Sequence, residues 1–315
     1  MQKYNYAIYH KNCLDGFTSL IILLKSKQLM DNSIVAYDMP STDVAPNGID
    51  NKNVIIMDVA YKYNVLREIV ERAKYTVFID HHVTISEDVK KISEQYKDKL
   101  LVVYDLKESG ASLTWSFLFK KKKMPLFIRY IKDNDIGEWK LKHTISFIYA
   151  IKTNYDTKYS SEVVNLWFKL FDNNIVKSLI KRGKIYSEYA NNLLEENSKR
   201  YSLELFPSEK IYNDFSEYFT KPGQYKVAVF NGGCPNVSLL GNKIVNEVDC
   251  DFALIWTYNM EKKEYIMSLR SKDVDVGKIA NIFGGGGHKF ASALSIPANK
   301  YIIQDLFFKE SLPRY

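Results

Sequence analysis

The strongest constraint on the fold is an apolar run that stops abruptly at one carboxylate and two imidazoles. Residues 76–79 are rich in β-branched and aromatic side chains, and Asp80, His81 and His82 follow them directly. Such a run is typical of a buried strand. Polar residues at its carboxyl end would lie where open α/β sheets bind their ligands. The triplet suits a divalent transition metal, although a solvated polar turn is the alternative for a short motif.

Other apolar runs in the first half of the chain also end in ionisable residues. Buried parallel strands are apolar along their whole length, and the segments between these runs have helical patterns. Strands that alternate with helices predict an α/β domain with a parallel sheet and helices on both faces. All carboxyl ends of such a sheet lie along one edge, so the polar residues are expected to converge. The runs are 6–9 before His10 and Asp15, 54–57 before Asp58, 76–79 before Asp80, and 100–104 before Asp105.

Short motifs of the same kind extend over nearly the whole chain. They are 10–17 (HKNCLDGF), Asp58, 80–82 (DHH), 109–112 (SGAS), 130–135 (YIKDND) and 284–288 (GGGGH). In this order, they resemble the successive motifs of the DHH phosphoesterases, and the second half resembles the DHH-associated domain. Within that superfamily, the resemblance is to the branch of NrnB-like oligoribonucleases and cyclic-nucleotide phosphodiesterases.

The resemblance implies a centre of two divalent ions, expected to be Mn²⁺ with Mg²⁺ as the alternative. Asp58 stands alone at its strand end and is the expected bridge between the ions. Asp80 is expected to orient a neighbour or carry a proton, and His82 to face the scissile phosphate as donor or general acid. The expected metal ligands are His10, Asp15, Asp58, His81 and Asp133, and the expected catalytic residues are His82 and Asp80.

The first motif departs from the pattern of the superfamily. Many relatives place an additional Asp near Asp15, where this chain has Cys13 and Phe17. One ion would then have fewer protein ligands, or Cys13 would approach a metal, or Cys13 is a small buried residue. The roles of Asp105 and Asp135 are also undecided. Each is either a carboxylate that supports the metal ligands or a cap for the helix that follows.

The glycine run in the second half predicts a phosphate site. Glycines let a backbone approach a ligand closely, and successive N–H groups can hold a phosphate. Arg270 would grip a phosphate with two donors, and His288 would add another. A flexible turn is the alternative for an isolated glycine run. The expected substrate-binding residues are Arg270, Ser271, Gly284, Gly285, Gly286, Gly287 and His288.

The 315 residues are enough for two domains with cores of their own. We expect a metal-binding DHH domain over 1–180, a helical linker over 181–209, and a smaller DHH-associated domain over 210–315. The smaller domain is predicted to be α+β with a mixed, mostly antiparallel sheet. The active site is expected in a cleft between the two domains.

These features predict a hydrolase for short RNA or DNA oligonucleotides or small nucleotide phosphodiesters. The alternatives are a phosphatase for 3′-phosphorylated nucleotides, a cyclic-dinucleotide phosphodiesterase, and a nucleotide-binding module without activity. A net charge of +7 favours an anionic partner. No apolar run approaches the roughly 18 residues of a membrane helix, and the scattered cysteines Cys13, Cys234 and Cys250 suit a reducing compartment. We therefore expect a cytoplasmic protein without membrane contact, and a homodimer is left open.

Overall fold

The computed structural model describes residues 3–40, 42–232 and 236–308, so Cys234 lies outside the described residues. The chain divides into two compact units, Met1–Ser187 and Glu188–Tyr315. The division falls inside the long helix α8 (Asn173–Asn197), within the segment expected as a linker. Among the helices of the described ranges, none combines the length and the apolar character needed to cross a membrane.

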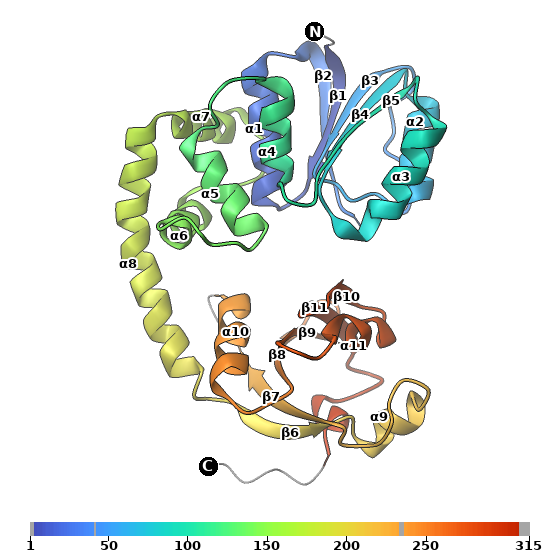
Figure 1. The fold of residues 1–315 in the computed structure, drawn as a ribbon, viewed down its shortest axis with the longest axis vertical. Coiled ribbons are helices and arrows are strands. Elements are labelled where there is room, and N and C mark those ends of the chain that lie inside the picture. Colours follow the sequence, from blue (N-terminus) through green and yellow to red (C-terminus); the bar gives the residue numbers. More distant parts are fainter. Residues whose placement is uncertain (1–2, 41, 233–235, 309–315) are drawn as a thin grey trace. The chain divides into compact units, whose positions relative to one another are not determined.

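The first unit is built on a five-stranded sheet with the order β2-β1-β3-β4-β5, in which all neighbours are parallel (Figure 1). This confirms the predicted parallel sheet. The edge strand β2 was not predicted, because its residues are only half-buried or exposed and include Asp31, Asn32 and Ser33. The strands are β1 (Tyr4–His10), β2 (Leu29–Asp38), β3 (Asn53–Met57), β4 (Tyr75–Asp80) and β5 (Leu100–Tyr104).

Helices cover both faces of this sheet, as predicted (Figure 1). Side chains alternate between the faces along each strand. Ile55 and Met57 therefore pack with α1 and α4 in one core, while Val54 and Ile56 pack with α2 and α3 in a second core. The helices named here are α1 (Leu14–Ser26), α2 (Tyr63–Arg72), α3 (Ser86–Gln95) and α4 (Gly110–Leu118).

Further helices extend the first of these two cores beyond α4. Phe127 and Ile131 of α5, Phe147 of α6 and Trp167 of α7 are all buried there. Trp167 packs edge-on against Phe17 of α1, with the ring centres 5.2 Å apart. This packing holds α5, α6 and α7 against the helices of the first core. The helices are α5 (Leu126–Asp135), α6 (Thr144–Asn154) and α7 (Ser161–Phe168).

The second unit contains a six-stranded sheet with the order β10-β11-β9-β8-β7-β6. Only β7 and β8 are parallel, so the prediction of a mixed, mostly antiparallel sheet is confirmed. One face packs on α11 and the other on α10. The elements are β6 (Ser202–Phe206), α9 (Glu209–Asp214), β7 (Tyr225–Asn231), α10 (Val237–Glu247), β8 (Phe252–Asn259), β9 (Glu264–Ser271), α11 (Val276–Ile282), β10 (Gly286–His288) and β11 (Ala291–Pro297).

Candidate metal centre

Three adjacent strands of the first unit end at residues that the sequence singled out. β1 ends at His10, β4 ends at Asp80, and Asp58 directly follows β3. The strands are neighbours in the order β1-β3-β4, and their parallel pairing brings the three ends together. Asp15 enters the same edge from the first turn of α1. The expected convergence at the carboxyl edge of the sheet therefore has a structural basis.

Asp58 lies at the middle of this edge and is only 1% exposed. Its φ of 64° is in the left-handed region, which Asp and Asn adopt more readily than most residues with side chains. Its N–H donates to the carbonyl of Ile79 at 2.9 Å, which fixes the turn. Oδ2 of Asp58 lies 3.4 Å from Nδ1 of His10, and Oδ1 lies 3.3 Å from Nε2 of His81. The two carboxylate oxygens thus face different imidazoles.

Around Asp58, potential metal-binding atoms lie close together in a carboxylate–imidazole cluster. Within each group of three residues, these atoms are no more than 4.8 Å apart. Several buried polar atoms here have no hydrogen-bond partner among the described residues, namely Nδ1 of His10, Oδ1 of Asp58, Oδ2 of Asp80 and Nε2 of His81. Unpartnered buried atoms of this kind need an explanation, and divalent cations would supply one. The groups are His10, Cys13 and Asp58; Asp58, His81 and His82; and Asp15, His81 and Asp135.

The N-terminus of α4 packs directly against two carboxylates of the cluster. The N–H of Ala111 donates to Oδ1 and Oδ2 of Asp15, at 3.1 and 3.2 Å. A Cβ on Gly110 would lie 2.7 Å from Cβ of Asp58 and 2.8 Å from Oδ2 of Asp15, so the helix needs glycine to come this close. Ser109 caps the helix by accepting a hydrogen bond from the N–H of Ser112. The Ser-Gly-Ala-Ser motif therefore positions acidic residues and offers no ligand of its own.

The carboxylates of the cluster have shifted pKa values. Burial raises the pKa of Asp15 well above its usual range, and the charges of Asp135 and Asp58 add to this. Burial and the charge of Asp58 raise the pKa of Asp135 to about 6. Burial also opposes ionisation of Asp58, but the imidazoles of His10 and His81 outweigh it and hold its pKa below the usual range. The carboxylates of Asp15, Asp58 and Asp135 repel one another, and this repulsion favours the binding of cations.

Asp80 is fully buried and holds His82 in position. Its Oδ1 accepts the N–H groups of His81 and His82, at 2.6 and 2.8 Å, and lies 2.8 Å from Nδ1 of His82. Burial lowers the pKa of His82, but Asp80 and the nearby carboxylates outweigh burial and raise it to about 9. Since Asp80 occupies Nδ1, the other ring nitrogen, Nε2, is left to meet a ligand. The side chain is 31% exposed.

Asp133, an expected metal ligand, does not lie among the grouped ligand atoms of the cluster. Its Oδ1 accepts the N–H of Lys140 at 2.9 Å, and its Oδ2 accepts the N–H of Leu141 at 3.1 Å. The hydroxyl of Thr144 also donates to Oδ2. The expectation for Asp133 is therefore corrected, because both oxygens hold the segment between α5 and α6.

Asp135, two residues further along α5, takes the place expected for Asp133. Its Oδ2 lies 3.3 Å from Nε2 of His81, and Asp15, His81 and Asp135 form one of the three groups. Asp105, whose role the sequence leaves undecided, is exposed and accepts the N–H of Lys107 at 2.9 Å in the turn after β5. Asp135 thus joins the cluster, whereas Asp105 stabilises a turn.

In the second unit, Arg270 is half-buried without an acidic partner. No carboxylate lies within ion-pair distance of its guanidinium among the described residues. The guanidinium donates to neutral oxygens, to the carbonyl of Leu269 at 2.7 Å and to Oγ of Ser238 at 2.7 Å. A Cβ on Gly241 of α10 would lie 2.5 Å from Cγ of Arg270, so the glycine makes room for this side chain. A positive charge held in this way is available for an anion.

Several other expected substrate-binding residues already have hydrogen-bond partners within the second unit. Ser271 is buried, and its hydroxyl donates to the carbonyl of Asp251 at 2.9 Å and accepts two backbone N–H groups. The N–H groups of Gly284 and Gly285 donate to carbonyls of α11 at 3.0 and 2.9 Å. Ser271 and these two amides are therefore occupied within the unit, in contrast to the expectation.

The remainder of the glycine run forms the edge strand β10, which pairs with β11. A Cβ on Gly285 would lie 2.3 Å from the carbonyl oxygen of Ala293, so close packing against β11 requires this glycine. Gly286 has only one neighbouring atom within 4 Å of such a Cβ, at 3.7 Å. The side chain of His288 is exposed at the end of the strand. Arg270 and His288 are thus the expected residues whose side chains remain available to a ligand.

Comparison with known proteins gives one family match and relatives over most of the chain. Residues 237–306 match the model of the DHHA1 domain. The chain is 29% identical over 310 residues to an uncharacterized protein of Acanthamoeba polyphaga mimivirus, covering 93% of this chain and 68% of that protein. It is 26% identical over 249 residues to an uncharacterized protein of Mycoplasma pneumoniae, covering 78% and 66%. The chain therefore spans about two thirds of the length of these relatives.

Solved structures are also similar to the chain over most of its length. One is the pGpG-specific phosphodiesterase PggH from Vibrio cholerae, with 12% identity, a TM-score of 0.48 and coverage of 94% of each chain. Another is an exopolyphosphatase-related protein from Bacteroides fragilis, with 15% identity and a TM-score of 0.46, covering 94% of this chain and 87% of that chain.

Proposed function

We propose that this chain, whose residues 237–306 match the DHHA1 domain, is a metal-dependent phosphodiesterase of the DHH superfamily. Its proposed substrates are short RNA or DNA oligonucleotides or small nucleotide phosphodiesters, as in the NrnB-like branch. The observation that carries this proposal is the placement of Asp58. Its two buried oxygens face the imidazoles of His10 and His81, each within 3.4 Å, as a carboxylate between two cations would require.

The proposed ligands of two divalent ions are His10, Asp15, Asp58, His81 and Asp135. Their fit to cations rests on the unpartnered buried atoms and on the mutual repulsion of the carboxylates. Mixed imidazole and carboxylate ligands suit Mn²⁺, with Mg²⁺ as the alternative, whereas Ca²⁺ prefers oxygen ligands alone. Two such ions, when bound, activate a water molecule and neutralise the charge that develops on the phosphate.

His82 is the proposed donor to the scissile phosphate or to the oxygen that leaves it. Its Nδ1 is held by Asp80, so Nε2 presents the proton. In the metal-free protein, Asp80 and the nearby carboxylates raise the pKa of His82 to about 9, which favours the protonated imidazole that a donor requires. In this proposal Asp80 acts through His82, whose orientation it fixes, and does not touch the substrate itself.

Arg270 and His288 are proposed to bind a second phosphate or the terminal group of the substrate. A half-buried guanidinium without an acidic partner among the described residues supports the role of Arg270. The exposed imidazole of His288 supports a weaker, adaptable contact. The DHHA1 domain would then select substrates, while the first unit carries out the hydrolysis.

The proposal is tested with a panel of substrates and two metal ions. The panel contains RNAs and DNAs from two to about twenty nucleotides, cyclic dinucleotides and 3′,5′-nucleotide bisphosphates, each with Mn²⁺ and with Mg²⁺. We expect kcat/KM to be highest for chains of a few nucleotides, because further nucleotides add only weak, salt-dependent backbone contacts. Activity confined to the bisphosphates would establish a phosphatase instead. Binding of nucleotides without any turnover would establish a sensor.

A further inference from the structure

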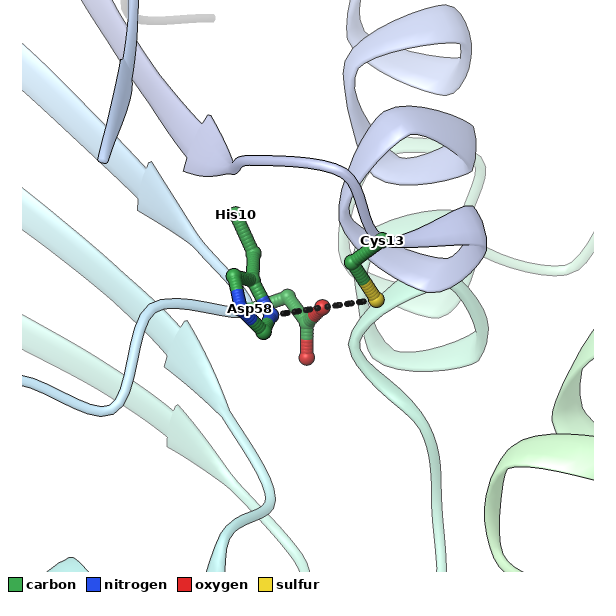
Figure 2. Close-up of side chains that lie close together, drawn as sticks. All are labelled: His10, Cys13 and Asp58. Atoms are coloured by element: carbon green, nitrogen blue, oxygen red, sulfur yellow. Dashed lines mark hydrogen bonds and ion pairs between the residues drawn. The ribbon is translucent and has the colours of Figure 1, made fainter. Parts of the chain in front are cut away.

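Cys13 stands directly before α1, where a helix usually has a capping residue. Ser, Thr, Asp and Asn are preferred there because their side chains accept a helical N–H. The side chain of Cys13 makes no such capping bond. Its Sγ lies 3.3 Å from Oδ2 of Asp58, the same oxygen that lies 3.4 Å from Nδ1 of His10 (Figure 2). The sulfur therefore lies beside Asp58 at the start of α1.

The site around Cys13 contains polar atoms that the protein leaves unpartnered. His10, Cys13 and Asp58 offer nitrogen, sulfur and oxygen ligand atoms within 4.8 Å of one another. On the side of Cys13, Nδ1 of His10 has no hydrogen bond within the described part of the chain. Oδ1 of the almost completely buried Asp58 has none either, and it faces His81 on the other side. A buried carboxylate needs polar partners, and the thiol of Cys13 supplies one by donating to Oδ2 of Asp58 at 3.3 Å. The sulfur is thus part of a donor set that points to a cation.

The donor set on the other side of Asp58 is chemically different. Asp15, His81 and Asp135 offer one imidazole and two carboxylates, and no sulfur. Carboxylates suit hard ions such as Mg²⁺ and Mn²⁺, whereas a thiolate selects softer ions such as Zn²⁺. The two sides of Asp58 therefore differ in the ions that they favour.

We propose that Cys13 is a metal ligand and that the two metal positions of the cluster are unequal. The position of His10, Cys13 and Asp58 takes a thiophilic divalent ion, such as Zn²⁺, Co²⁺ or Fe²⁺. The position of Asp15, His81 and Asp135 takes Mn²⁺ or Mg²⁺. Binding forms a metal–sulfur bond and releases the thiol proton to solvent. This inference rests on the proposed metal centre and goes beyond it by assigning a ligand and a metal class.

The test uses cobalt as a spectroscopic probe on the metal-free chain of 315 residues. A Co²⁺–thiolate bond gives a charge-transfer absorption in the near ultraviolet that nitrogen and oxygen ligands do not give. We expect this band in the unmodified chain and in a Cys234→Ser/Cys250→Ser double variant, and its loss in Cys13→Ser. Circular dichroism of Cys13→Ser checks that the fold is kept. Absence of the band from the unmodified chain, or its survival in Cys13→Ser, overturns the proposal.

A second measurement uses a variant that restores a carboxylate. Metal-free chain is dialysed against equal concentrations of Zn²⁺ and Mn²⁺, and the bound metals are quantified. In Cys13→Asp, we expect the ratio of bound zinc to bound manganese to fall by roughly tenfold or more, since even indirect partners of metal ligands change affinity by that amount. An unchanged ratio contradicts the proposal even if Cys13→Ser does not fold.

These measurements are independent of the proposed activity. A chain that binds cobalt through Cys13 but hydrolyses no nucleotide would refute the proposed function and leave the ligand assignment in place. A chain that hydrolyses nucleotides with Mn²⁺ but lacks the thiolate band would refute the ligand assignment alone.

Discussion

Asp133 and Asp135 are two residues apart on α5, yet only Asp135 reaches the cluster, where its Oδ2 lies 3.3 Å from Nε2 of His81. The oxygens of Asp133 are occupied by backbone N–H groups of Lys140 and Leu141. Residues at i and i+2 of a helix point in different directions, so one can serve the site and the other the fold. This difference gives a matched pair of substitutions.

Asp133→Asn is expected to destabilise the protein, and Asp135→Asn is expected to impair metal binding. The first substitution places an amide NH₂ group against backbone donors whose hydrogen bonds a carboxylate oxygen now accepts, which costs about 1–3 kcal/mol. Asp135→Asn should leave the unfolding temperature of the metal-free protein equal or higher, because the charge of nearby Asp58 disfavours a second carboxylate. Thermal unfolding in chelator and metal quantification separate the two effects. Loss of metal from Asp133→Asn with full stability would reverse the assignment.

Asp58→Asn is expected to lose turnover and to lower metal affinity by at least roughly 100-fold, the upper range for residues that only support metal ligands. Asn tolerates a positive φ such as the 64° of Asp58, so the turn should survive. Circular dichroism checks the fold, and equilibrium dialysis measures bound Mn²⁺. A folded variant that retains both ions and full activity would exclude Asp58 as the bridge.

The metal-free protein is expected to lose stability as pH rises from about 6.5 to about 9. His82 has a pKa of about 9 in the folded protein and an ordinary value of 6.5. Protonation of His82 therefore stabilises the fold fully below 6.5, and this stabilisation is lost as pH rises through the folded pKa. The raised pKa of His81 acts in the same direction. Protonated Asp135 also stabilises the metal-free fold, and this contribution is lost as pH rises from the ordinary pKa of 3.8 to about 6.

Unfolding temperatures measured in chelator across this pH range test the dependence. His82→Gln should show a flatter profile between pH 6.5 and 9, because the titrating group is absent. If the unmodified protein and His82→Gln have parallel profiles, the titration of His82 does not control stability in this range.

Arg270→Ala is expected to reduce kcat/KM for a dinucleotide more than for a minimal chromogenic phosphodiester. A dinucleotide has groups beyond the scissile phosphate, and contacts to them also orient the reacting group. Arg270→Lys keeps the charge but cannot donate two parallel hydrogen bonds. Its kcat/KM for the dinucleotide should therefore lie between those of the unmodified protein and Arg270→Ala. Equal losses on both substrates would place Arg270 at the reaction itself.

Gly285→Ala and Gly286→Ala distinguish packing from phosphate binding in the glycine run. A methyl group on Gly285 would collide with the backbone of β11, so we expect a destabilisation of about 1–3 kcal/mol. Gly286 has room for a methyl group, and its substitution should preserve stability. If Gly286→Ala retains stability but loses dinucleotide affinity, the backbone of β10 contacts the substrate.

The strands could be predicted where the sequence is continuously apolar. Continuous apolar runs identified β1, β3 and β4, since a strand buried on both faces excludes polar residues. A continuous apolar run also identified β5, although it is a half-buried edge strand. β2 was not predicted because Asp31, Asn32 and Ser33 interrupt its apolar residues. β6 was not predicted because its short alternating sequence lies in the expected linker. β10 escaped because glycine carries no strand propensity.

The site was predictable at strand ends and less so on helices. His10, Asp58 and His81 could be placed because parallel strands share one carboxyl edge. The choice between Asp133 and Asp135 depends on the rotation of α5 about its axis, which packing against α1 and α4 determines. The occupied hydroxyl of Ser271 likewise depends on contacts far along the chain, with Asp251.

All members of the carboxylate–imidazole cluster come from residues 10–135, within the unit Met1–Ser187. The second unit has its own hydrophobic cores. A ligand stabilises only the part of a protein that it binds in the folded state. Metal should therefore delay the thermal unfolding of the first unit and leave that of the second unchanged, which makes the DHHA1 domain an internal reference against which metal affinity can be read in a single calorimetric scan.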